Sequence, residues 1–205
     1  MKNAILFISF LLVSLGASAQ GNISSKPVES VVQLGGGLFL ETGNDHRIKE
    51  QNPGAMLRLS YGLDIRLSKK LSVMPGAGIR AQHGDIMHWR DYGGDCDALV
   101  FADVFLSGRY HLDAGRQGVI IGLGPAFSYM VSPVYYDVSN VKLEKFSRYD
   151  IGIQPSVTFL TSSHFQWGLE ANIGLLDLRE RYPHINMPFG STYLHYLAVT
   201  CGWHF

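Results

Sequence analysis

Apolar residues recur at every second position in eight separate segments of this chain. The clearest segment runs from Ala55 to Leu67, where seven apolar residues alternate with positions that include Arg58, Asp64 and Arg66. A period of two puts neighbouring side chains on opposite faces of a β-strand. The sequence therefore predicts an all-β protein whose strands each have two chemically different faces.

The predicted strands have one apolar and one polar face throughout. They span residues 32–40, 55–67, 71–82, 98–112, 119–131, 149–160, 165–176 and 192–205. No Asp, Glu, Lys or Arg falls on the apolar faces, whereas the opposite faces hold these charged residues: Arg58, Asp64, Arg66, Arg80, Asp103, Arg109, Asp150 and Glu170. Such an asymmetry fits a barrel with its apolar faces outward in lipid, or a soluble sandwich with those faces inward.

The connections and the aromatic residues favour the barrel. Long connections, at 41–54, 83–97, 132–148 and 177–191, alternate with short ones, at 68–70, 113–118 and 161–164. Aromatic residues gather near both ends of the strands, as in the girdles of membrane barrels: Tyr110, Phe159, Trp167, Trp203 and Phe205 at one end, and Tyr129, Tyr149 and Tyr193 at the other. Because lipid offers no hydrogen bonds, strands cross it only as a closed barrel. We predict an eight-stranded antiparallel up-and-down transmembrane β-barrel with short periplasmic turns and long extracellular loops.

The N-terminus has the pattern of a secretory signal peptide. Lys2 precedes an apolar run from Ala4 to Leu15, and Ala17 and Ala19 form an A-x-A cleavage site. The run is shorter than the roughly twenty residues that a spanning helix needs. We predict a cleaved signal at 1–19, a short segment at 20–30 and a barrel domain at 31–205, located in the bacterial outer membrane.

Eight strands leave a lumen that side chains can fill, so the inward charges must pair inside it. The short turn after Leu67 places Arg58 opposite Arg80, with Asp103 as the expected counter-ion and Asp150 as another from across the lumen. A second network is expected near the periplasmic end, formed by Asp64, Arg66, Arg109 and His111. We favour a structural role for these charges over a catalytic one.

The overall charge excludes a nucleic-acid partner, because 17 Lys and Arg balance 17 Asp and Glu and leave no basic footprint. The second long connection is chemically dense and contains His83, Asp85, His88 and Asp91. Imidazole and carboxylate groups this close can bind a divalent metal or act as acid and base. Neither the two-His helical zinc motif nor the calcium-loop pattern is present, so we expect no metal and no cofactor. We expect a solvated loop that binds rather than catalyses.

The two cysteines are expected to stay free. Cys96 lies in that external connection, whereas Cys201 lies on the lipid-facing side of the last strand near its periplasmic end. Their separation approaches the height of the barrel, far beyond the reach of a disulfide.

The Ala17-Ser18-Ala19-Gln20 junction, the eight alternating strands and the terminal segment 197–205 together resemble the small outer-membrane β-barrel proteins of the OmpA/OmpX-like type, in particular the porin-like outer membrane protein β-barrel domain. The resemblance covers nearly all of the mature chain. In that family, a last strand ending in Phe is read by the barrel-assembly machinery. The resemblance therefore implies Trp203 and Phe205 as an assembly signal and this machinery as a partner. It implies no particular activity, because the family is defined by its architecture.

Three prolines depart from the pattern. Pro75, Pro125 and Pro155 fall mid-strand on the lipid-facing side, where each removes a donor from the hydrogen-bond ladder. We expect a bulge or a local bend at each site. A resemblance to lipid-modifying barrels offers an alternative, in which outward prolines weaken pairing and open a lateral path for an acyl chain. His195, the only strongly polar outward residue, lies near the outer rim.

These features together favour a non-enzymatic, monomeric outer-membrane barrel in contact with outer-membrane lipids, whose loops bind a surface partner or support envelope integrity. Two alternatives stay open: a narrow solute channel, and a lipid-active enzyme that uses His83, Asp85 or His88.

Overall fold

A computed structural model describes residues 27–43, 53–83, 98–112, 118–131, 137–138, 141–142, 147–161, 164–177 and 192–205. The predicted signal peptide and most of the long connections lie outside these ranges. So do the candidate loop residues Asp85, His88 and Asp91, and Cys96.

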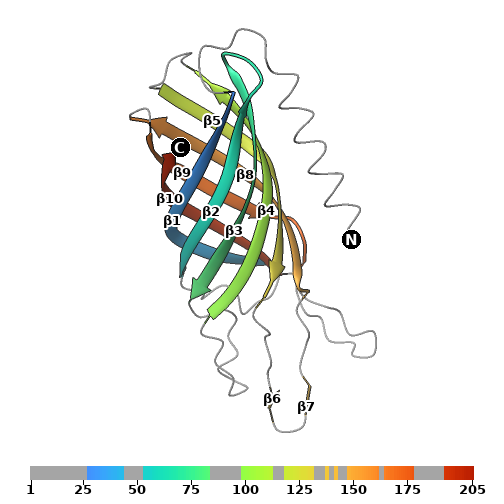
Figure 1. Cartoon of the computed structure of the whole chain (residues 1–205). Helices are drawn as coiled ribbons and strands as arrows, with labels where there is room; N and C mark the ends of the chain where they lie inside the picture. Colours follow the sequence, from blue (N-terminus) through green and yellow to red (C-terminus); the bar gives the residue numbers. More distant parts are fainter. Residues whose placement is uncertain are drawn as a thin grey trace.

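Eight long strands close into one antiparallel barrel (Figure 1). They are β1 (Val28–Gly43), β2 (Gly54–Arg66), β3 (Leu71–His83), β4 (Ala98–His111), β5 (Gly118–Met130), β8 (Tyr149–Leu160), β9 (Phe165–Gly174) and β10 (Thr192–His204). Each long strand pairs with the next one along the chain, and β1 closes the barrel by pairing with β10. The predicted eight-stranded up-and-down barrel is confirmed. Among the described residues, no helix is long and apolar enough to cross a membrane.

The two ends of the barrel differ. Short connections join the strands at the end that we call the turn end, and the longer connections leave from the opposite end, the loop end. The two-residue strands β6 (Asp137–Val138) and β7 (Val141–Lys142) form a separate hairpin. This hairpin lies beyond the loop end, at the bottom of Figure 1.

β1 is longer than the sequence pattern indicated. The residues at its two ends do not alternate clearly between apolar and polar. They are nevertheless paired with β2, from Val28↔Ile65 onward, and with β10, as far as Gly43↔Thr192. The ladder, rather than the hydrophobic pattern, therefore sets the ends of this strand.

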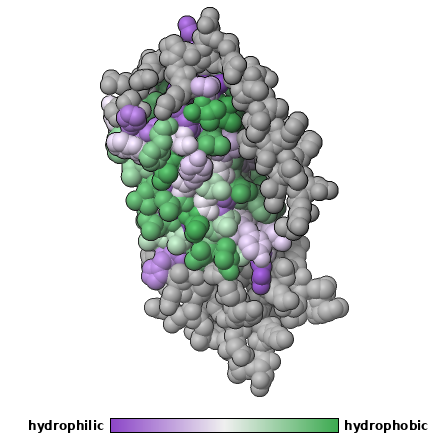
Figure 2. Space-filling view, in the orientation of Figure 1, coloured by the Kyte–Doolittle hydropathy of each residue, from purple (hydrophilic) through white to green (hydrophobic). Residues whose placement is uncertain are grey.

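The outer surface of the wall is apolar and the inner surface is polar. Outward Leu57 and Leu123 are each 58 % exposed, whereas inward Arg80 and Gln82 are both fully buried. Figure 2 shows hydrophobic residues over most of the coloured wall on the visible face, with hydrophilic residues near both ends. A wall this apolar exceeds the patches that water-soluble monomers expose, and it is suited to lipid on all sides.

The strands are tilted, as closure requires. The register runs from Gln33 on β1 through the inward residues Ser60, Gly78, Asp103, Ser128 and Asp150. Continued through β9 and β10, it returns to β1 at Gly43, ten residues from its start. Each register row therefore climbs toward the loop end in the direction from β1 to β8.

The three prolines interrupt the ladder without a bulge. Beside Pro75, the β2–β3 ladder stops at Gly62↔Gly76 and resumes in the same register at Ile65↔Val73. Similar two-pair gaps lie beside Pro125 in the β4–β5 ladder and beside Pro155 in the β8–β9 ladder. A bulge adds a residue to one strand and so shifts the register. Of the expected bulge or local bend, the bulge is therefore wrong, and the ladder has a gap beside each proline instead.

Inward glycines set how closely the wall packs beside one of these gaps. A Cβ atom at Gly124 would lie 1.8 Å from the Leu106 carbonyl oxygen. We expect Gly124→Ala to destabilise the barrel by about 1–3 kcal/mol, because backbone must move to admit the methyl group. The measurement is the temperature at which the folded band disappears in gel electrophoresis. Gly36→Ala is the control, since its nearest neighbour would be 3.9 Å away; an equal effect of the two substitutions would contradict this packing argument.

Candidate functional site

The polar lumen is the most elaborate site in the described part of the chain. On the loop-end side of the lumen, Arg58 of β2 and Arg80 of β3 are paired in register. Asp103 of β4 lies between them, with its Oδ2 3.8 Å from Arg58 Nε and 3.2 Å from Arg80 Nε. Arg80 Nη2 also donates to Ser128 Oγ at 3.1 Å. One carboxylate thus serves two adjacent guanidinium groups, as the turn geometry predicts.

The carboxylate that pairs with Arg58 from across the lumen is Glu170. Arg58 Nη1 donates to Glu170 Oε1, and the Tyr196 hydroxyl donates to the same oxygen at 2.7 Å. Gln154 Nε2 in turn donates to the Tyr196 hydroxyl at 2.9 Å. The Asp150 carboxylate makes no side-chain hydrogen bond among the described residues, and the charge of Arg80 and the backbone amides of Ile151 and Leu176 act on it. Glu170 is paired with Ser156, six residues closer to the turn end than Asp150 on β8, and this position puts its carboxylate within reach of Arg58.

Aromatic rings hold both guanidinium groups in place. Arg58 lies 4.8 Å from the ring centroid of Phe105, and Arg80 lies between Phe101, at 4.4 Å, and Tyr196, at 5.1 Å. Cation–π contacts of this kind are strongest where water is excluded, as it is here because both arginines are buried. The cluster is therefore a fixed cross-brace rather than a set of mobile charges.

A second network occupies the turn end. Arg109 Nη1 donates to Asp64 Oδ2 at 2.8 Å, and its Nη2 donates to Gln166 Oε1 at 3.3 Å. His204 lies 2.8 Å from the same Gln166 oxygen and 3.1 Å from Glu29 Oε2. The network therefore links β1, β2, β4, β9 and β10 across the turn end of the lumen.

The remaining expected members of this network lie at its edge. His111 Nε2 contacts Ser72 Oγ at 2.9 Å, and Arg66 is half-buried at the end of β2. Sequence reasoning did not single out Glu29, Gln154, Gln166, Tyr196 and His204. For Gln154, Gln166, Tyr196 and His204 the available signal was an inward position in the alternating pattern, whereas Glu29 precedes the predicted first strand.

A small internal cavity separates the two networks. Its volume is about 20 Å³, and its polar lining includes Ser107, Arg109, Gln154, Glu170 and Thr200. A cavity of this size holds about one water molecule. At the level of this cavity, side chains therefore fill most of the lumen.

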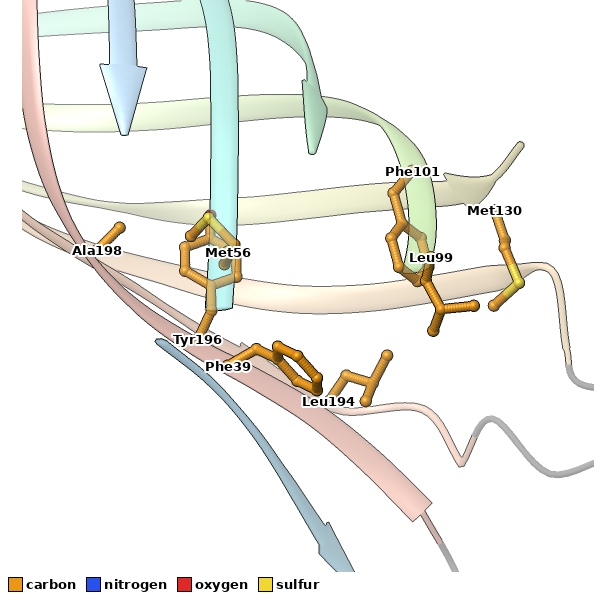
Figure 3. Close-up of a cluster of buried hydrophobic side chains, with 8 residues drawn as sticks. All are labelled: Phe39, Met56, Leu99, Phe101, Met130, Leu194, Tyr196 and Ala198. Atoms are coloured by element: carbon orange, nitrogen blue, oxygen red, sulfur yellow. The ribbon is translucent and has the colours of Figure 1, made fainter. Parts of the chain in front are cut away.

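Apolar side chains fill the lumen toward the loop end (Figure 3). This apolar layer consists of Phe39, Met56, Leu99, Phe101, Met130, Leu194, Tyr196 and Ala198. Its members come from β1, β2, β4, β5 and β10, so opposite walls meet here. The sequence placed Phe39 inward but gave no indication that the layer forms a cluster.

The other candidate residues lie outside the lumen. His83 is exposed at the loop end of β3, and no group of three His, Cys, Asp or Glu within the described ranges is arranged to hold a metal ion. Cys201 is free and exposed on the outer wall. Outward His195 contacts Thr42 Oγ1 at 2.6 Å and accepts the Gly174 amide at Nδ1, which satisfies it at the rim.

Solved structures with a similar fold are outer-membrane proteins. Ail, the attachment invasion locus protein of Yersinia pestis, has 8 % identity and a TM-score of 0.53, over 86 % of this chain and 98 % of that chain. The chain has the fold of the small outer-membrane β-barrels. Neisserial surface protein A shares this small-barrel fold at 12 % identity and a TM-score of 0.52, over 86 % of this chain and 97 % of that chain. No family model and no curated protein matches the sequence.

The lumen of this small barrel is built for mechanical stability. The ion pairs Arg58–Asp103, Arg58–Glu170 and Arg109–Asp64 join strands that are not neighbours in the barrel. The acyl path considered for the prolines gains no support, because the cavity behind the wall is only large enough for water.

The shared carboxylate gives a direct test. Asp103→Ala removes the carboxylate that Arg58 and Arg80 share and leaves Glu170, paired with Arg58, as the remaining ion-pair partner. We therefore expect a loss of about 3–5 kcal/mol in the free energy of unfolding. Urea titration of the barrel in lipid vesicles measures it. Asp137→Ala, in the β6–β7 hairpin, removes the same charge outside the barrel and is the control. Equal stability of the two variants would contradict the cross-brace.

Proposed function

We propose that this chain is an integral, non-enzymatic protein of the bacterial outer membrane, with a closed lumen and external loops that act in surface binding or envelope integrity. The observation that carries the proposal is the filled lumen inside an apolar wall. Arg58, Arg80 and Arg109 are fixed by ion pairs, and the cavity between the networks admits only water. This arrangement supports a scaffold rather than a channel.

The loop end is where we place the binding role. Long connections on a rigid barrel are the usual position for recognition. Of the two solved structures named above, one is called an attachment invasion locus protein and the other a surface protein. These names support, by analogy of architecture alone, a surface role for the loops of this chain, including His83, Asp85, His88 and Asp91.

Conductance tests the closed lumen. We expect the purified barrel to give no resolved current steps in planar lipid bilayers, because no continuous water-filled path crosses the salt-bridged layers. A porin added to the same bilayer provides the positive control. Reproducible steps from the barrel alone would support the narrow solute channel instead.

Assembly of the barrel into the outer membrane tests the proposed role of Trp203 and Phe205 as an assembly signal. The outward side chains of Trp203 and Phe205 are 48 % and 61 % exposed at the end of β10, which leaves them available to the assembly machinery as the resemblance implies. We expect deletion of Phe205 to reduce the amount of folded, heat-modifiable protein in outer-membrane fractions several-fold. Val199→Ala, which shortens an equally exposed outward side chain of β10, should leave it unchanged. Normal assembly without Phe205 would contradict the assembly signal.

A further inference from the structure

A histidine on the outer wall joins three strands at the loop end of the barrel. His195 of β10 lies in register with Leu40 of β1 on one side and with Ile173 of β9 on the other. Its two ring nitrogens bond in both directions: Nε2 lies 2.6 Å from Thr42 Oγ1 of β1, and Nδ1 lies 3.2 Å from the amide nitrogen of Gly174 of β9. The imidazole therefore links β10 to both of its neighbours.

The bond to Gly174 extends the pairing of β9 and β10 past the end of their ladder. The last registered pair of these strands is His195↔Ile173, so the Gly174 amide lies beyond it. A Cβ atom at Gly174 would lie only 2.3 Å from the Leu194 carbonyl oxygen, so the two strands still run close together here. A backbone amide at a lipid-facing rim needs an acceptor, and the imidazole supplies it.

The Gly174 amide fixes the protonation state of the ring. A backbone N–H can only donate, so Nδ1 of His195 must carry a lone pair and no proton. The ring is then the neutral tautomer with its proton on Nε2, which donates to the Thr42 hydroxyl. An imidazolium carries a proton on both nitrogens. A proton on Nδ1 and the Gly174 N–H would point at each other, so protonation of the ring breaks this bond.

The surroundings of the ring contain no ion that fixes its charge. No charged group in the described strands acts on His195. Its titratable neighbour on the same face of β10 is Tyr193, which stays neutral near neutral pH. The neighbours on β1 and β9 are Leu40, Thr42 and Ile173, which carry no charge. The charge of the ring therefore depends on the pH and on its own two bonds.

We propose that His195, Thr42 and Gly174 form a pH-sensitive rim clasp, closed when the ring is neutral and open when it is protonated. Histidine in an unfolded chain takes up a proton at about pH 6.5. Since that proton displaces the Gly174 amide, the bond contributes fully at neutral pH and is lost as the pH falls below about 6.5. Opening frees the end of β9 and so loosens one root of the long connection between β9 and β10.

Nuclear magnetic resonance of the full-length mature protein in detergent micelles tests the rim clasp. The side-chain nitrogen signals of His195 report which ring nitrogen carries a proton. Hydrogen exchange, normalised to the rate of an unstructured chain at each pH, reports the protection of the Gly174 amide. At about pH 7.5 we expect a proton on Nε2 alone. At about pH 5 we expect both nitrogens to be protonated and the protection of Gly174 to be about three- to tenfold lower, as for the loss of one hydrogen bond.

Controls separate the rim clasp from a general effect of acid. The Met130 amide donates to the Arg148 carbonyl oxygen at 2.7 Å at the same end of the barrel and should keep its protection. His195→Asn puts an amide oxygen near the position of Nδ1 without an ionisable group, so Gly174 should be protected equally at both pH values.

His195→Leu has no acceptor and should give low protection of Gly174 at both pH values. A proton on Nδ1 of the unmodified protein at about pH 7.5, or protection of Gly174 that is the same at both pH values, would overturn the proposal. An undiminished pH response in His195→Asn would overturn the assignment to His195.

Discussion

Closure of the backbone hydrogen-bond ladder is the constraint on which the rest of this structure depends. An apolar wall in contact with lipid has no water to satisfy its amides, so each strand must be paired on both sides. Pairing of β1 with β10 removes the last free edges. Once the wall is closed with its apolar faces outward, every second residue of each strand points into a narrow interior. The charged residues of the strands lie at these inward positions.

That confinement explains why the lumen contains networks instead of isolated charges. A buried ion needs both a counter-ion and hydrogen bonds to offset its desolvation. Asp103 bridges two arginines, and Glu170 receives donors from Arg58 and Tyr196. The contacts of Arg58 with Asp103 and with Glu170 join strands that are not neighbours, so they connect the wall across its interior in addition to the ladder around its circumference.

The sequence predicted the fold well because the strands of a closed barrel alternate apolar outward residues with polar inward residues at a period of two. Strand number, facing and the pairing of Arg58 with Arg80 all follow from alternation and one short turn. The pairing of Arg58 with Glu170 could not be predicted from the sequence. It depends on the tilt of the strands, and this tilt is determined only by the registers of all eight strand pairs. The ends of β1 were missed for a similar reason: they are held by neighbours rather than by their own hydrophobic pattern.

The effect of the three prolines on the strand ladder could be predicted only in part from the sequence. Sequence identified where donors are missing, but not that the register continues unchanged. Met74, Ser107 and Gln154 each belong to a pair that is absent from the ladder beside a proline, and all three line the internal cavity. The internal cavity therefore lies directly behind all three interruptions of the wall, so that its hydration and the integrity of the ladder are linked by position.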